Sequence, residues 1–264
     1  MTRPHLTRCT AAGAIVLALA PVVTQAQRGG FPPPPPSPRL AAPIDLTGYW
    51  VSFVTEDWRY RVATPPKGDY NSVPLNPAGR KTADAWDPAR DEAAGEQCKA
   101  YGVGGVMRLP GRLHVAWQDD RTLTIETDTG SQVRTLRFVA VPPGAPDWQG
   151  GSQASWDRMQ GPMGAGLVFG GGGFGVGNAG GGSLKVITKG MKPGYLRKNG
   201  VPYSADATIT EYLDRFDLPG GDALLVVSTE VVDPTYLAQP FWTSTHFKKQ
   251  RDATGWKPTP CTAR

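Results

Sequence analysis

Apolar and polar residues alternate along most of the chain. In ATITEYLDRF (207–216), for example, Ile209, Glu211, Leu213 and Arg215 share one side of a two-residue period. Successive side chains of a β-strand point to opposite faces of its sheet, so this period predicts strands. The segments that carry it are 45–54, 58–62, 112–117, 121–128, 132–141, 183–190, 194–198, 207–216, 223–232 and 240–249.

Short polar links join several of these segments. Gln118-Asp119-Asp120 and Thr129-Gly130-Ser131 separate three consecutive strands, and Pro219-Gly220-Gly221-Asp222 separates two later ones. Glycine, proline and aspartate favour tight turns, so we expect the three strands between residues 112 and 141 to form an antiparallel meander.

Helical patterns are confined to residues 76–100. Asn76 is a good N-cap residue and Pro77 suits the first helical position, which predicts a helix over 76–87. A second short helix is expected over 90–97. About ten strands with one helical excursion predict an all-β domain, either an antiparallel β-barrel or a closely related sandwich.

The N-terminus has the layout of a secretory signal peptide. Arg3 and Arg8 precede an apolar run over 11–20, and small residues follow at 24–26. Signal peptidase substrates have this order of charged, apolar and small residues, and the run is too short to span a bilayer. A buried N-terminal helix is the alternative.

The expected organisation follows from this cleavage site. Residues 1–26 form the signal peptide, 27–44 a proline-rich linker and 45–264 a single β-domain. Five consecutive prolines favour an extended, stiff linker. The protein is expected in the periplasm or outside the cell, without a stable membrane anchor, because Cys9 precedes the apolar run and a lipid-anchoring cysteine would follow it.

The glycine-rich stretch between two strands contains GVGNAG (175–180), which matches the dinucleotide-binding pattern G-x-G-x-x-G. In nucleotide-binding domains that pattern follows a strand and opens a helix. Here it runs into further glycines and then into the strand-like LKVIT. We therefore interpret 159–183 as a flexible loop insertion and expect no cofactor.

Two cysteines, Cys98 and Cys261, remain after cleavage of the signal peptide. An exported compartment permits disulfides, and an even count favours one bridge between them; two buried free thiols are the alternative. The mature chain has only His114 and His246, without the spacing of a zinc site, so no metal is expected.

Composition excludes one class of partner. The formal net charge is +5, but the 28 basic residues are scattered rather than clustered, so we expect no nucleic-acid binding. All eight tryptophans lie in the mature chain. An aromatic barrel interior would suit a small apolar or aromatic ligand, although core packing explains the same residues.

Two resemblances extend this interpretation. LTGYW (46–50) resembles the G-x-W opening of the lipocalin-like, or calycin-like, barrels. The order of EQCKAYG, VMRLPGRLHVAW, LTIETDTGSQVR, GYLRKNGVPYS, ITEYLDRF and VVDPTYLAQPF is similar to that in a group of exported bacterial β-rich proteins with no assigned activity. The resemblance implies an exported β-rich protein and no particular catalytic residues.

Charged and polar residues within the strand patterns are the candidate site residues. Glu211 and Arg215 share a face with aliphatic residues, so each needs a partner on another strand or in a ligand. We expect Arg59 or Arg61 to pair with Glu211, and Glu126 or Asp128 to pair with Arg215. The full set of candidate site residues is Arg59, Arg61, Tyr203, Glu211, Arg215 and His246.

Three functional hypotheses remain open. The favoured one is an exported soluble β-barrel that binds a small apolar or aromatic ligand in its interior. The alternative is an exported hydrolase, lyase or isomerase that uses an acid or base in the cavity. A structural role in the cell envelope is the third. His246 beside Ser244 does not make a catalytic triad, because no nucleophile elbow occurs.

Overall fold

A computed structural model describes residues 34–142, 144–158 and 182–264, and Pro36–Arg264 forms one compact unit. The expected signal peptide and nearly all of the glycine-rich insertion lie outside the described residues. Both therefore stay predictions.

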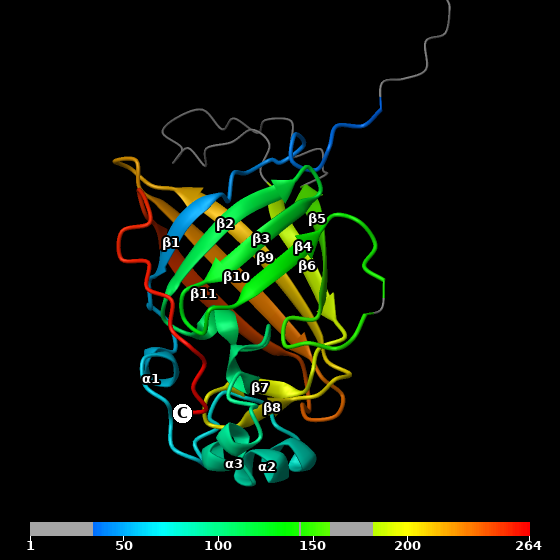
Figure 1. The fold of residues 1–264 in the computed structure, drawn as a ribbon, viewed down its shortest axis with the longest axis vertical. Coiled ribbons are helices and arrows are strands. Elements are labelled where there is room, and N and C mark those ends of the chain that lie inside the picture. Colours follow the sequence, from blue (N-terminus) through cyan, green and yellow to red (C-terminus); the bar gives the residue numbers. More distant parts are fainter. Residues whose placement is uncertain (1–33, 143, 159–181) are drawn as a thin grey trace, which may run out of the picture. The chain divides into compact units, whose positions relative to one another are not determined.

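Nine strands close into a barrel in the order β1-β11-β10-β9-β6-β5-β4-β3-β2 (Figure 1). Neighbouring strands are antiparallel except β4 and β5, which pair in parallel at Leu136–Ser152 and Arg137–Gln153. The barrel strands are β1 Gly48–Ser52, β2 Arg112–Asp119, β3 Thr122–Thr127, β4 Val133–Arg137, β5 Gly151–Arg158, β6 Gly182–Lys189, β9 Thr208–Asp217, β10 Ala223–Val232 and β11 Phe241–Lys249. The predicted all-β barrel is confirmed.

The predicted meander is also confirmed, because β2, β3 and β4 pair consecutively and antiparallel. Glycines occupy the turns where the backbone needs a positive φ, such as Gly130 (79°) and Gly220 (86°). The β5 strand, GSQASWDR, escaped prediction because its inward positions include Ser152 and Ala154, which give little hydrophobic contrast.

Helices and a small hairpin lie at one end of the barrel, here called the base (Figure 1). They are α2 Pro77–Asp84, α3 Pro88–Ala93, the 3₁₀ turns η1 Lys99–Tyr101 and η2 Val106–Arg108, and the hairpin of β7 Gly194–Arg197 with β8 Val201–Tyr203. The Asn76 side chain caps α2 by accepting a hydrogen bond from the Gly79 N–H at 2.8 Å. The predicted bridge is present: Cys98 and Cys261 form a disulfide that ties the C-terminal segment to the base.

One predicted strand is wrong. WRYRV (58–62) contains the short helix α1 Trp58–Arg61. The alternation would place Trp58, Tyr60 and Val62 on one face of a strand, yet Trp58 is 68% exposed and Val62 66% exposed. Arg61 is the buried residue instead, because it pairs with Glu56 and donates from Nε to the Arg108 carbonyl at 2.9 Å. These polar contacts decide the local structure.

The barrel interior is filled by side chains. Trp50 and Phe247 are buried with aliphatic residues of the surrounding strands in one core cluster. A second cluster, which includes Tyr203 and Met191, packs the base. Inward positions of small barrels are commonly filled in this way, so an open site is expected at an end of the barrel rather than in its middle.

Candidate functional site

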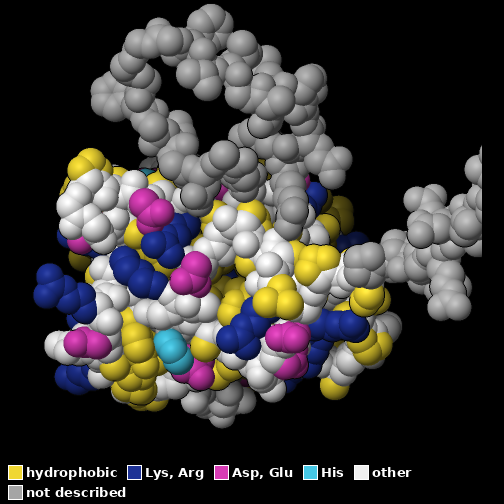
Figure 2. Space-filling model, turned by 90° about the horizontal axis from the view of Figure 1, so that it is seen from above, with side chains coloured by type: hydrophobic (Ala, Val, Ile, Leu, Met, Phe, Trp, Pro, Cys, Tyr) yellow, Lys and Arg dark blue, Asp and Glu magenta, His cyan; other side chains and the backbone are white. Residues whose placement is uncertain are grey.

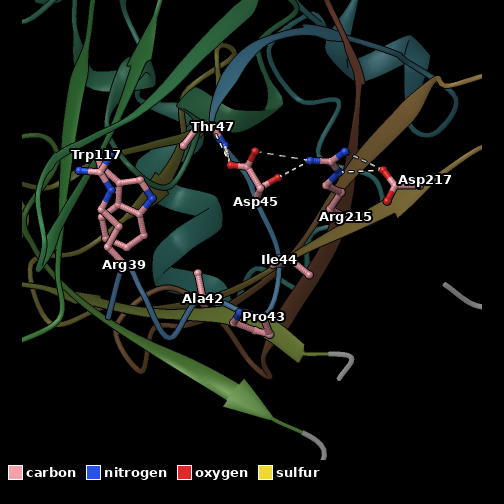
Figure 3. A pocket seen from close by; sticks show the side chains of 9 residues that line it. All are labelled: Arg39, Ala42, Pro43, Ile44, Asp45, Thr47, Trp117, Arg215 and Asp217. Atoms are coloured by element: carbon pink, nitrogen blue, oxygen red, sulfur yellow. Dashed lines mark hydrogen bonds and ion pairs between the residues drawn. The ribbon is translucent and has the colours of Figure 1, made fainter. Parts of the chain in front are cut away.

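A cavity of about 490 Å³ opens at the end of the barrel opposite the base, here called the mouth (Figure 3). Its lining comes from the chain that precedes β1, from the end of β2 and from the end of β9. The lining residues are Arg39, Ala42, Pro43, Ile44, Asp45, Thr47, Trp117, Arg215 and Asp217. Ligand pockets in proteins commonly have volumes of this order.

The segment before β1 is attached to the rim of the mouth. The Arg39 backbone N–H donates to the Asp120 carbonyl at 3.2 Å, and the Trp156 indole N–H donates to the Pro38 carbonyl at 2.7 Å. Residues 36–44 were expected to belong to the linker. In the structure they form one wall of the mouth cavity.

Aromatic side chains form another part of the mouth. The rings of Trp117 and Phe138 stack with centroids 5.5 Å apart, and Trp156 lies 5.4 Å from Phe138. All three are partly buried against the barrel core. Trp117 therefore offers the cavity a supported aromatic surface, which favours contact with an apolar or aromatic group.

The charged residues Asp45, Arg215 and Asp217 lie on the other side of the cavity from Trp117 (Figure 3). Arg215 donates to the Asp217 carboxylate at 2.7 Å and to the Asp45 backbone carbonyl at 2.7 Å, and the three residues lie side by side in Figure 3. Arg39 has no carboxylate partner among the described residues. Over this end of the molecule, basic and acidic side chains are interspersed (Figure 2).

The mouth carboxylate of Asp45 is held in its ionised form. Burial alone would raise its pKa, but hydrogen bonds from the Thr47 hydroxyl and backbone N–H outweigh burial, and the pKa is lowered with help from Lys249 and Arg215. A carboxyl group whose pKa lies below its ordinary value is a poor proton donor near neutral pH. Asp45 is therefore suited to holding charged groups in place rather than to acid catalysis.

Lys249, one of the two cations that lower the pKa of Asp45, lies over the ring of Trp50. The Trp50 indole N–H donates to the Leu46 carbonyl at 2.9 Å, and the Lys249 ammonium lies 4.5 Å from the centre of the Trp50 ring. Lys249 also donates to the Thr47 carbonyl. The G-x-W tryptophan thus has a packing role in which a cation from the last strand covers its ring.

Glu211 has a partner that sequence reasoning missed. Arg134 on β4 binds it through two parallel hydrogen bonds, Nη1 to Oε1 at 3.0 Å and Nη2 to Oε2, and each side chain is only 1% exposed. The expectation that Arg59 or Arg61 would pair with Glu211 is wrong, because α1 lies at the base. The alternation in VRTLR (133–137) could have identified Arg134, because it places Arg134 on the same face of the strand as Leu136.

The expected partners of Arg215 are also wrong. Asp45 and Asp217 surround it at the rim, whereas Glu126 lies beside His114 and Asp128 accepts from the Arg112 backbone N–H. Glu211 and Arg215 do share one face of β9. They belong to different environments, the barrel interior and the mouth.

The remaining candidates lie elsewhere. Tyr203 is fully buried in the base, where burial raises the pKa of its hydroxyl well above the ordinary value. Arg59 is exposed and pairs with Asp69. His246 contacts the Thr55 and Ser244 hydroxyls and lies 3.3 Å from Glu56, which also binds Arg61. The structure therefore links His246 to Arg61, and neither to Glu211, Arg215 or Tyr203.

Comparison with protein-family models, curated proteins and solved structures found no match to this chain. Within residues 34–142, 144–158 and 182–264, no cluster of three or more histidine, cysteine, aspartate or glutamate side chains is arranged to hold a metal ion. No helix in the same ranges is both long and apolar enough to cross a bilayer. The class of protein that the fold and the cavity define is a closed β-barrel with a polar and aromatic mouth.

Proposed function

We propose that this protein is exported and binds a small aromatic or apolar molecule with an acidic group at the mouth of its barrel. The observation that carries the proposal is the cavity of about 490 Å³, in which Trp117 and charged side chains face the same space. The interior is occupied by side chains, which favours the mouth over the centre of the barrel as the binding place.

The chemistry of the lining supports an acidic aromatic ligand. Trp117 offers a ring surface, and the ring of a ligand can stack on it. Arg39 has no carboxylate partner among the described residues, whereas Arg215 already binds Asp217. An anionic group on the ligand would give Arg39 a counter-charge, whereas a cationic group would not pair with Arg39 and would bind less tightly.

Export is supported by the charged, apolar and small residues of 1–26 and by the Cys98–Cys261 disulfide, since disulfides persist in oxidising compartments. Fractionation of the producing cells and N-terminal sequencing test it. The expected mature N-terminus follows Ala26, and an uncleaved cytoplasmic protein would contradict export.

Calorimetric titration with a panel of aromatic acids, amines and alcohols tests the binding proposal. We expect the acids to bind best. Trp117→Ala should weaken the best binder about tenfold or more, because the stacking surface is lost. Arg39→Gln should weaken it by about 2–5-fold, as expected for an exposed ion pair.

Two variants serve as matched controls. Trp242 is 56% exposed on β11, and Arg59 is exposed on α1, both away from the mouth lining. Trp242→Ala and Arg59→Gln should bind as the unmodified protein does. Equal losses in the control and mouth variants, or no binding by any compound, would refute binding at the mouth.

A further inference from the structure

Three buried arginines converge at the base, on the opposite side of the molecule from the proposed ligand site. Arg61 of α1, Arg108 of η2 and Arg197 of β7 are 5%, 7% and 4% exposed. All three line one small cavity of about 20 Å³, together with Tyr60 and Lys198. This volume exceeds the roughly 10–15 Å³ that one water molecule needs, so the cavity has room for a small polar group.

Each of these guanidinium groups carries N–H groups without an acceptor. The atoms are Nη2 of Arg61, Nη1 of Arg108, and both Nε and Nη2 of Arg197, none of which has a hydrogen-bond partner among the described residues. Buried donors are nearly always satisfied, because an unsatisfied one loses its hydration without compensation. The three arginines that carry these four donors line one cavity, which points to an acceptor that binds there.

The charges of the cluster are unevenly compensated. Arg61 binds Glu56, and Arg108 binds Asp57 at 2.7 Å. Arg197 has no carboxylate within ion-pair distance among the described residues: its Nη1 donates to the Asn71 carbonyl at 2.7 Å, and its guanidinium lies 4.2 Å from the centre of the Tyr60 ring.

The environment of Arg197 is correspondingly unfavourable for a cation. Burial, followed by repulsion from Arg108, lowers the pKa of its guanidinium to about 10. Lys198 adds a further positive charge to the cavity wall, although its ammonium contacts the Tyr101 and Thr262 hydroxyls and the Arg264 carbonyl. Asp57 and Asp69 offset this effect on the Arg197 pKa only in part, and they are bound to Arg108 and Arg59.

We infer that this arginine cluster is a binding site for a small oxyanion. Guanidinium groups match carboxylate and phosphate oxygens through paired N–H donors, and several donors from three elements would surround one anion. The anion would bridge α1, η2 and β7, which are far apart in sequence. It would therefore stabilise the base as well as neutralise Arg197.

Thermal unfolding in sodium phosphate, sodium formate and sodium chloride at equal ionic strength tests this site. We expect phosphate or formate to raise Tm saturably above the value in chloride, by about 5–11 °C at a hundredfold excess over Kd. Phosphate and formate distinguish a tetrahedral oxyanion from a planar carboxylate. An equal response to chloride, or no saturable response to any salt, would overturn the oxyanion site.

Variants locate the response. Arg197→Gln should abolish the rise in Tm, whereas Arg59→Gln, an exposed change on helix α1 two residues before Arg61, should retain it. A full response in the Arg197→Gln protein would overturn the assignment. If that variant does not fold, crystals of the unmodified protein are soaked in selenate. An anomalous peak among the three arginines supports the site, and its absence there together with no saturable response of Tm to formate refutes it.

Discussion

Replacing Glu211 with glutamine removes one charge from the buried Arg134–Glu211 pair and leaves its size nearly unchanged. Both side chains are 1% exposed, and the pair joins β4 to β9 across the barrel interior. Among the described residues, the Glu211 carboxylate is the only hydrogen-bond partner of the Arg134 guanidinium, and Arg134 Nε has none. Glu211→Gln would therefore leave a buried cation without a counter-charge.

The expected cost is large. Breaking a buried ion pair by removing one partner costs about 3–5 kcal/mol, because the remaining charge loses its compensation in a poorly solvated place. Glutamine still offers one acceptor oxygen, which favours the lower end of that range. At roughly 2–4 °C per kcal/mol for a domain of this size, Tm should fall by about 6–20 °C.

Urea unfolding measures this loss directly through the free energy of unfolding at constant m-value. Glu230→Gln is the matched control, because Glu230 lies on the neighbouring strand β10 and is only partly buried. The double variant Arg134→Met, Glu211→Leu should recover most of the loss, since an apolar pair removes both charges. A Glu211→Gln protein whose free energy of unfolding lies within about 1 kcal/mol of that of the unmodified protein would refute a structural role for the pair. If such a protein had also lost ligand binding, β9 would be the functional site.

Two further predictions concern other parts of the fold. Changing both Cys98 and Cys261 to alanine should lower the free energy of unfolding by up to about 5 kcal/mol, because in the chain-entropy model the bridge closes a loop with a sequence separation of 163 residues. Chemical denaturation measures this loss, and a loss below about 1 kcal/mol would contradict the prediction. Burial lowers the pKa of Lys249, so the unfolded chain retains this proton to higher pH than the folded protein does. The free energy of unfolding should accordingly rise with pH between the lowered pKa of Lys249 and about 10.5. In the Lys249→Met protein this rise should be absent, and identical pH profiles of stability for the two proteins would contradict the prediction.

The barrel could be predicted because its strands repeat one simple pattern. Alternate residues are buried along almost the whole of β10 and over residues 208–213 of β9, so the two-residue period identifies both strands. Four residues are too few for the same argument at Trp58–Arg61, where ion pairs of Arg61 set the conformation. Likewise, β5 buries serine and alanine, which alternation does not distinguish from its exposed residues.

The site was less predictable because it depends on contacts between distant segments. Arg134 and Glu211 are 77 positions apart, and their pairing follows from barrel closure rather than from either strand. Arg39 belongs to a segment whose prolines predicted only an extended chain. Its attachment through Trp156 requires the three-dimensional arrangement of the mouth.

Fluorine NMR of protein labelled with 5-fluorotryptophan tests ligand binding at the mouth most directly. Trp117 lines the cavity, and Trp242 is exposed on β11 away from it, so the two indoles report on different surfaces. Trp117→Phe and Trp242→Phe assign their resonances. We predict that titration with the best-binding aromatic acid shifts the Trp117 resonance saturably and leaves that of Trp242 unchanged; a bound ligand that leaves Trp117 unshifted would contradict a binding site at the mouth of the barrel.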